Sequence, residues 1–389
     1  MSNPLSIYIH IPFCKRRCNY CDFVTYAGKA ALIPDYLNAL CIEIELTASR
    51  NHVTETVDTI YFGGGTPSIL SIDQLATVLD QLRSTFTISN NAEITIEVNP
   101  GDCDQAFVAG IRQFGFNRVS LGMQSALDSE LVMMGRRHTH ADTQNAVASL
   151  KTTGFDNISL DLIFGYPCQS LSTWIESIQA ALALNPQHIS LYALSVEKRT
   201  PLAKQLKAGL FQPKEDSYFS DVYAKACELL ESASFRHYEI SNWSREKIFE
   251  SRHNSKTWRL EPYLGFGVGA HGYYRGVRTQ NLSSINGYIE RLQYERKTGG
   301  KRFPAASIVR KQTNLEEQQN YLIFGLRQLE EGIDPSAFEM RFGITLEKAF
   351  CKPLERLLRQ KAIHFQPNGN LVINRELAFV SNQIFVEFI

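Results

Sequence analysis

Apolar residues in the first half of the chain follow two alternating patterns. Short runs rich in β-branched and aromatic residues predict strands, and longer stretches with apolar residues three or four positions apart predict helices between them. The predicted strands are Ser6–Ile9, Thr59–Phe62, Glu93–Val98, Arg118–Leu121, Asn157–Leu162 and His188–Ala193. The predicted helices are Ile33–Ala48, Ile72–Phe86, Asp104–Phe114, Thr139–Thr152 and Leu171–Ala183.

Strands separated by helices are typical of a parallel sheet built from right-handed βαβ units. Six such units are too few to close an eight-stranded barrel, so we expect an open one. The predicted fold class is therefore α/β, with a partial (β/α)6 TIM-like barrel. In this architecture the chemistry gathers at the C-terminal ends of the strands.

The regular alternation fades after about Ala193. A helix is predicted over Ser217–Ser232, and a glycine- and aromatic-rich stretch runs from Tyr263 to Gly276. Near the C-terminus, helices followed by a hairpin suggest a small winged-helix-like domain. Its predicted elements are the helices Leu315–Leu329, Pro335–Phe342 and Leu346–Arg359 and the strands Ala362–Phe365 and Leu371–Ile373. We expect three parts: the partial barrel over 1–255, a connecting segment over 256–300 and the C-terminal domain over 301–389.

Three of the eight cysteines lie close together near the N-terminus, as Cys14, Cys18 and Cys21. Soft thiolates in a C-x3-C-x2-C run favour an iron–sulfur centre. A [4Fe–4S] cube held by three cysteines has one iron free to bind another group. Structural zinc would need four ligands, and no second cysteine pair follows. His10 could supply a fourth ligand, but it lies in an alternating run and is expected to point off a strand. A disulfide framework is disfavoured because the other cysteines are isolated.

The charge balance limits the kinds of partner. The chain has 40 basic and 40 acidic residues, so its net charge is zero. This argues against a large electrostatic grip on nucleic acid. No secretory signal and no membrane span are expected, because the N-terminus lacks the signal pattern and no long apolar run follows. Unpaired cysteines and an exposed cluster fit a reducing compartment, so we expect a cytoplasmic protein. The oligomeric state is left open.

A glycine-rich segment follows the second predicted strand. It reads Gly63-Gly64-Gly65-Thr66-Pro67. A tight turn would need fewer glycines, whereas three in a row let the backbone approach a ligand closely. No lysine follows them, so this is not a phosphate loop.

Polar side chains stand at the ends of the later strands. Glu97 could accept two ribose hydroxyls, or it could be a solvated strand-end charge. Gln124 can both donate and accept, and Arg136 could bind a carboxylate bidentately. Asp161 lies in an apolar run, where an unpaired carboxylate is costly, so it needs a partner such as a ligand hydroxyl or amine. Together with the cysteines, these residues suit a ligand with amino acid, ribose and base parts.

This ordered set of motifs strongly resembles the radical S-adenosylmethionine (SAM) superfamily. The match is to the branch that contains the oxygen-independent coproporphyrinogen III oxidases and the HemW heme chaperones. The resemblance implies that Cys14, Cys18 and Cys21 hold a [4Fe–4S] cluster whose fourth iron is chelated by SAM. It also implies that an electron from the cluster can cleave SAM to a 5′-deoxyadenosyl radical. The residues that match SAM-contacting positions are Tyr8, Tyr20, Gly64, Gly65, Thr66, Glu97, Gln124, Arg136 and Asp161.

Three features favour the chaperones within this branch. The oxidases carry a fourth cysteine where Phe23 stands here, and they have a longer N-terminal arm. The run from His253 to Trp258 resembles the chaperones' H-N-x-x-Y-W motif, with Thr257 in place of tyrosine. The resemblance implies His253 as an axial heme ligand and Trp258 as a stacking partner for the porphyrin. A surface or capping histidine is the alternative. His271 also matches a family loop, which loop structure explains equally well.

The expected function is that of a heme chaperone that binds a [4Fe–4S] cluster, SAM and heme and passes heme to a hemoprotein. The implied partners are heme, the recipient hemoprotein and an electron donor. A peripheral membrane association through the recipient is left open. The alternative is an enzyme that decarboxylates coproporphyrinogen III, so enzymatic activity is also left open. Radical modification of RNA or protein finds little support in the neutral charge, and the C-terminal domain is expected to pack or to bind a partner.

Overall fold

The first half of the chain forms the predicted partial barrel. The computed structural model describes residues 4–389. Six neighbouring strands pair in parallel, and each contains or overlaps a predicted strand, so the α/β partial barrel is confirmed. In spatial order they are β1 (Leu5–Ile11), β4 (Val57–Gly64), β5 (Ile88–Val98), β6 (Arg118–Gln124), β7 (Ile158–Phe164) and β8 (His188–Ala193).

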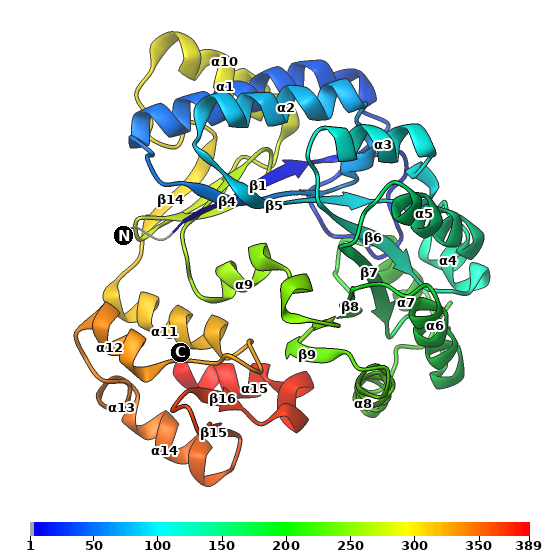
Figure 1. Ribbon diagram of the computed structural model, residues 1–389, viewed down its shortest axis with the longest axis vertical. Helices are drawn as coiled ribbons and strands as arrows, with labels where there is room; N and C mark the ends of the chain where they lie inside the picture. The colour runs from blue at the N-terminus through cyan, green and yellow to red at the C-terminus, as the bar shows by residue number, and fades with distance from the viewer. Residues whose placement is uncertain (1–3) are drawn as a thin grey trace.

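Helices cover the outer face of the barrel (Figure 1). Several begin where the sequence provides a cap, because Ser71, Thr139 and Ser170 each form a capping box with the third helical residue. The helices of this half are α1 (Ile33–Asn51), α2 (Ile72–Thr85), α3 (Gln105–Gln113), α4 (Asp128–Met134), α5 (His140–Thr152), α6 (Leu171–Ala183), α7 (Pro201–Lys207) and α8 (Asp216–Ser232). The predicted helices are confirmed to within a few residues.

The strand sequences alternate between the two faces of the sheet. Apolar residues such as Ile60 and Ile96 are buried against the outer helices. Polar residues such as Glu93, Thr95 and Arg118 are also buried and lie on the inner face. The inside of the barrel is therefore polar, which suits it to hold a polar ligand or an ordered hydrogen-bond network.

The sheet continues beyond both ends of the barrel to twelve strands. Parallel to β1 lies β11 (Tyr263–Phe266), followed by antiparallel strands β12 (His271–Tyr274), β13 (Val277–Asn281) and β14 (Ala306–Lys311). At the other end, β10 (Asn242–Ser244) and β9 (Arg236–Glu239) pair in antiparallel. A separate two-stranded sheet joins β2 (Phe13–Cys14) to β3 (Tyr26–Ala27).

The range 256–300, expected as a connecting segment, thus supplies three strands of the main sheet. It also supplies α10 (Ile285–Thr298), which packs against α1. Strands β11 and β12 approach closely at Gly265, where a Cβ atom would lie 1.9 Å from the carbonyl oxygen of His271. The division into 1–255, 256–300 and 301–389 stays a prediction.

The C-terminal unit follows the predicted order of helices and hairpin, with two corrections. The helix predicted over Leu315–Leu329 ends at Gly325. The helix predicted over Leu346–Arg359 is two helices, separated at Phe350. Pro353 explains the break, because its ring would clash with the carbonyl of Ala349 in a continuous helix. The elements are α11 (Asn314–Gly325), α12 (Pro335–Phe342), α13 (Leu346–Ala349), α14 (Cys351–Arg359), α15 (Asn382–Phe385) and the antiparallel strands β15 (Ile363–Phe365) and β16 (Leu371–Ile373).

A short helix, α9 (Arg252–Trp258), lies on the concave side of the sheet (Figure 1). It stands between the barrel strands and the C-terminal unit, and it carries the histidine motif singled out in the sequence. Within residues 4–389, no helix has the length and apolar character needed to cross a membrane.

Candidate functional site

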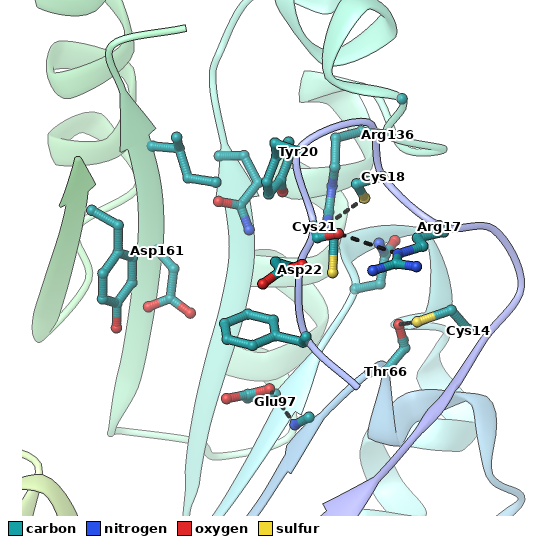
Figure 2. Close-up of a pocket in the computed structure, with 18 of the residues that line it drawn as sticks. Cys14, Arg17, Cys18, Tyr20, Cys21, Asp22, Thr66, Glu97, Arg136 and Asp161 are labelled. Carbon is teal, nitrogen blue, oxygen red and sulfur yellow. Dashed lines mark hydrogen bonds between the residues drawn. The ribbon is translucent and has the colours of Figure 1, made fainter. Parts of the chain in front are cut away.

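A cavity of about 620 Å³ opens at the C-terminal ends of the barrel strands. Figure 2 shows the cysteine loop on one side of it and Asp161 on the other. Because the strands are parallel, their carboxyl ends bring side chains from distant parts of the chain to this mouth. The sequence-predicted residues that line the cavity are Cys14, Cys18, Tyr20, Cys21, Gly64, Gly65, Thr66, Glu97, Gln124, Arg136 and Asp161.

Cys14 ends the short strand β2, and Cys18 and Cys21 lie in the loop between β2 and β3, which we call the cysteine loop. The Thr66 hydroxyl donates to Sγ of Cys14 at 3.5 Å, and the Arg136 guanidinium donates to Sγ of Cys18 at 3.5 Å. Burial raises the pKa of the Cys14 and Cys21 thiols. A bound cationic cluster would reverse this effect, since iron binds the thiolate form.

The chemistry of this donor set fits an iron–sulfur cube. Among residues 4–389, no three His, Cys, Asp or Glu side chains converge tightly enough to hold one metal ion. A [4Fe–4S] cube takes its thiolates on separate irons, so it suits cysteines that are spread around one end of a cavity. Donors aimed at the sulfur atoms are typical of such sites, because they tune the reduction potential of the cluster.

The cysteine loop is fixed to the barrel from two sides. The buried Asp102 carboxylate accepts from Lys15 at 2.7 Å and from Arg137 at 3.2 Å. Asn19 donates through its backbone to Met134 at 3.0 Å and through its side chain to Met133 at 2.8 Å. The positions of the three thiols are therefore set by contacts with the loop after β5 and with α4.

Two buried carboxylates face the cavity. Glu97 accepts from the Tyr61 hydroxyl at 2.9 Å and from the Gly64 backbone at 3.1 Å. Burial raises the pKa of Glu97 to about 7, with a further contribution from the nearby Asp161. Asp161 accepts from Ser120 at 2.7 Å, and burial raises its pKa as well. Asp161 thus has a protein partner, in addition to any ligand group that reaches it.

Two polar atoms beside these carboxylates have no partner within residues 4–389. They are Oε1 of Gln124 and Nε of Arg136, and both are buried. Gln124 also has a positive φ of 65°, which costs energy for a residue with a side chain. Buried polar atoms normally have a hydrogen-bond partner, so these two unpartnered atoms fit a polar ligand in the cavity.

The glycine loop lies against the end of β1. At Gly64, φ is +116°. A Cβ atom there would lie 2.6 Å from the His10 ring, and at Gly65 it would lie 2.7 Å from the Phe13 carbonyl oxygen. The glycines are therefore needed for close packing on the protein itself, and they also leave the backbone exposed to the cavity.

Tyr8 and His10 lie beneath this loop rather than on the cavity wall. The Tyr8 hydroxyl is 3.0 Å from Nδ1 of His10, and Nε2 of His10 is 2.9 Å from the Val24 carbonyl. Both ring nitrogens of His10 thus have protein partners, which agrees with its expected position on a strand. Tyr61, which sequence analysis missed, stacks on Tyr8 at 6.2 Å and lines the cavity. Tyr61 stands two residues before Gly63, on the inner face of the strand, and this position could have indicated its place in the cavity.

His253 lies inside the barrel and is only 6% exposed. Its Nδ1 is 3.1 Å from the Thr59 hydroxyl, and its ring packs at 5.1 Å from the ring of Tyr61. Burial lowers its pKa to about 3, so the ring is neutral. The residues that line the cavity do not include it. Heme iron could reach this ring only if α9 left its place.

Trp258 and Thr257, the other residues of the histidine motif, also contact neighbouring residues of the protein. Arg327 stands 4.4 Å above the Trp258 ring, and Phe324 lies beside it at 6.1 Å. The Thr257 hydroxyl donates to the His253 carbonyl at 3.2 Å. His271 is exposed on β12. Phe23, where the resemblance implies a fourth cysteine in the oxidases, lines the cavity and is 70% exposed.

Comparison with known proteins identifies the family. The radical SAM superfamily model matches residues 8–181. A heme chaperone HemW from Bacillus subtilis is 32% identical over 385 residues, which cover 99% of each chain. This chain belongs to the HemW family of radical SAM proteins. A second HemW, from Mycobacterium tuberculosis, is 40% identical over 74% of each chain.

The fold of this chain also matches that of a solved structure. Coproporphyrinogen III oxidase (HemN) from Escherichia coli, described as a radical SAM enzyme, matches 100% of this chain and 90% of its own with a TM-score of 0.83. The identity is 20%, so this likeness shows the fold alone. Membership of the radical SAM superfamily implies an iron–sulfur cluster and SAM as cofactors, which the thiols and the orphaned polar atoms of the cavity fit.

Proposed function

We propose that this protein is a heme chaperone that binds a [4Fe–4S] cluster, SAM and heme and transfers heme to a hemoprotein. The supporting observation is its similarity, along almost the whole chain, to a protein named heme chaperone HemW. The oxidase alternative has weaker support, because the Escherichia coli oxidase is only 20% identical. Phe23 in place of a fourth cysteine also favours the chaperone.

In this proposal Cys14, Cys18 and Cys21 hold the cluster. The hydrogen bonds from Thr66 and Arg136 would stabilise added negative charge on the sulfur atoms. Together, a bound cluster and SAM would supply one-electron chemistry at the sulfonium group. Reduction of the cluster would need an electron donor, which we include among the partners.

SAM would occupy the space between the cysteines and the two carboxylates. Gln124 and Arg136 have unpaired polar atoms for its polar groups, with the guanidinium suited to the carboxylate. Glu97 and Asp161 would face the ribose and the amine. The remaining assigned residues are Tyr20 and the loop residues Gly64, Gly65 and Thr66, with Tyr8 acting from beneath.

The partner in this proposal is a hemoprotein that receives the heme, and a peripheral membrane association through that recipient is left open. A cytoplasmic location stays a prediction. His253 as the iron ligand also stays a prediction, and it requires α9 to move because the ring is buried.

The proposal is tested by titrating the purified, cluster-containing protein with hemin. A Soret band that saturates at micromolar protein is expected. Absence of heme binding would contradict the chaperone function. A parallel anaerobic assay with reductant, SAM and coproporphyrinogen III should give no protoporphyrinogen. Turnover in that assay would favour the oxidase alternative instead.

A further inference from the structure

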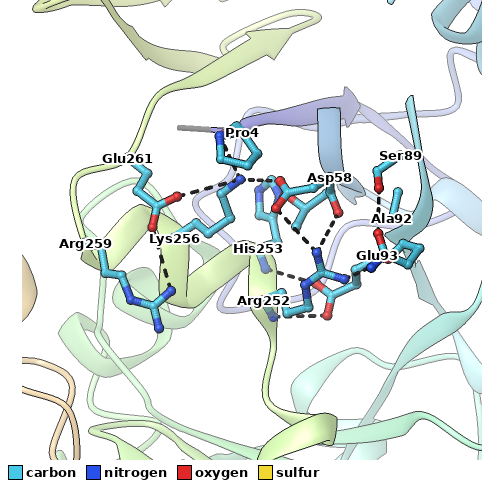
Figure 3. A network of polar contacts seen from close by, with 12 residues as sticks. Pro4, Asp58, Ser89, Ala92, Glu93, Arg252, His253, Lys256, Arg259 and Glu261 are labelled. Carbon is cyan, nitrogen blue, oxygen red and sulfur yellow. Dashed lines mark hydrogen bonds and ion pairs between the residues drawn. The ribbon is translucent and has the colours of Figure 1, made fainter. Parts of the chain in front are cut away.

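Polar and charged groups anchor helix α9 to β4, to β5 and to the residue that precedes β1 (Figure 3). The Lys256 ammonium binds the Asp58 carboxylate and donates to the Pro4 carbonyl at 2.9 Å. Arg252 lies 3.4 Å from the same carboxylate. The buried Glu93 carboxylate accepts from the backbone N–H groups of Arg252 and His253, each at 3.0 Å. The first turn of α9 is thus fixed to β4 and β5.

The ring of His253 extends from this anchored helix toward the cavity. It packs against one side of the Tyr61 ring at 5.1 Å, and Tyr8 stacks on Tyr61 at 6.2 Å. The Tyr61 hydroxyl donates to Glu97 at 2.9 Å. A continuous series of contacts therefore runs from α9 through Tyr61 to a carboxylate of the cavity, although His253 does not line the cavity itself.

We propose that His253 is a positioning residue for the SAM site, which holds the Tyr61 ring in place and thereby orients the Glu97 carboxylate. The inference rests on the proposed role of the cavity in binding SAM. It gives the histidine of the motif a task that its buried position allows, whereas iron ligation would require α9 to leave the barrel.

The chemistry of the ring supports this assignment. Burial and the positive charges of Lys256 and Arg118 lower the pKa of His253 to about 3. A neutral imidazole packs against a tyrosine ring without placing a cation beneath the cavity. Its Nδ1 has the Thr59 hydroxyl at 3.1 Å, which fixes the ring plane.

The hydrogen bond from Tyr61 also affects the protonation of Glu97, by favouring its ionised form. The titratable groups that face this carboxylate are Tyr8, Tyr61, Asp161 and Tyr192. Burial raises the pKa of Glu97 to about 7, and the hydrogen bond from Tyr61 opposes that rise. Ribose hydroxyls bind an ionised carboxylate better than a protonated one. SAM binding should therefore weaken as the pH falls through about 7, and loss of the Tyr61 bond should move this midpoint to higher pH.

The test measures SAM affinity against pH by anaerobic equilibrium binding to the cluster-containing protein. Tyr61→Phe should weaken binding about fivefold at neutral pH and raise the midpoint. His253→Ala should shift the midpoint in the same direction, whereas His253→Phe keeps a ring against Tyr61 and should restore it. His237→Ala is the matched control, because His237 is also buried but stacks on Trp243, away from Glu97.

The outcomes separate this inference from the proposed function. Wild-type affinity and midpoint in His253→Ala would overturn the inference, and so would an equal shift in His237→Ala. Loss of the Soret band in His253→Ala with SAM binding intact would also overturn it, while supporting a chaperone with His253 as ligand. A wild-type protein that binds heme but not SAM would refute the SAM site alone. If His253→Ala does not fold, His253→Leu keeps side-chain bulk but removes the ring against Tyr61 and should shift the midpoint in the same direction, and an unchanged midpoint would overturn the inference.

Discussion

Removing one partner of the ion pair that anchors α9 should destabilise the protein far more than breaking an exposed pair. The Lys256 side chain is 6% exposed and that of Asp58 is 18% exposed. In Asp58→Asn, the ammonium keeps the Pro4 carbonyl at 2.9 Å and Glu261 at 3.7 Å but loses its one close carboxylate. Leaving a buried charge without its partner costs about 3 kcal/mol.

This magnitude can be converted into a melting temperature. Unfolding entropy is about 2.1 cal/mol/K per residue, which gives about 0.8 kcal/mol/K for 389 residues. Asp58→Asn should therefore lower Tm by about 4 °C. Lys256→Met should cost less, about 1 kcal/mol, because Asp58 keeps Arg252 at 3.4 Å.

The assay is a double-mutant cycle followed by thermal unfolding and by hydrogen exchange. The combined Asp58→Asn, Lys256→Met variant should be more stable than the sum of the single losses predicts, because no unpaired buried charge remains. Amide exchange should accelerate in α9 in Asp58→Asn. Asp80→Asn, which breaks an exposed pair with Arg83, is the control and should cost less than about 0.5 kcal/mol. Additive losses, or equal losses in Asp58→Asn and Asp80→Asn, would refute the reasoning.

Three further predictions concern the loops and the core. Cys18→Ser should abolish the visible absorbance of the reconstituted cluster. Cys351→Ser changes an exposed cysteine and should retain that absorbance. Retained absorbance in Cys18→Ser would exclude this thiol as a ligand. Gly64→Ala should lower both stability and SAM affinity, because the position has φ +116° and its Cβ would meet the His10 ring; unchanged affinity would show that the loop can rearrange. Burial raises the pKa of Glu43 from 4.5 to about 7, so stability should fall as the pH rises from about 4.5 to above 7, by on the order of 3 kcal/mol. Glu43→Gln should flatten the curve of unfolding free energy against pH over that range, and an unchanged slope would contradict the assignment.

The barrel could be predicted because its strands and helices each carry a local signal. Apolar residues alternate in strands such as β4, and caps such as Ser71 mark helix starts. The cavity residues followed from the same logic, since parallel strands end at one edge and Glu97 and Asp161 stand near those ends. The break before α14 could also have been predicted from the sequence, because Pro353 cannot continue a helix.

The remaining features depend on contacts between distant residues. Strand β11 has only four residues, one of them glycine, and its pairing partner β1 lies more than 250 positions earlier. The position of His253 depends on Thr59, which is 194 residues away. Nothing in a short polar helix indicates that it turns inward, so the sequence could suggest a chemical role for His253 but not its burial.

The order of strands in the sheet also affects when the cysteine loop can reach its final structure during synthesis of the chain. Strand β1, which leads into Cys14, lies between β4 and β11, and Ser6 pairs with Tyr263. A ribosome that adds about 5–20 residues per second needs roughly 10–50 s to reach β11 after β1 has emerged. Throughout that time one edge of β1 has no strand beside it. We therefore expect iron–sulfur assembly on this chain to follow translation, with the cysteine loop maturing among the last parts of the barrel although it is made among the first.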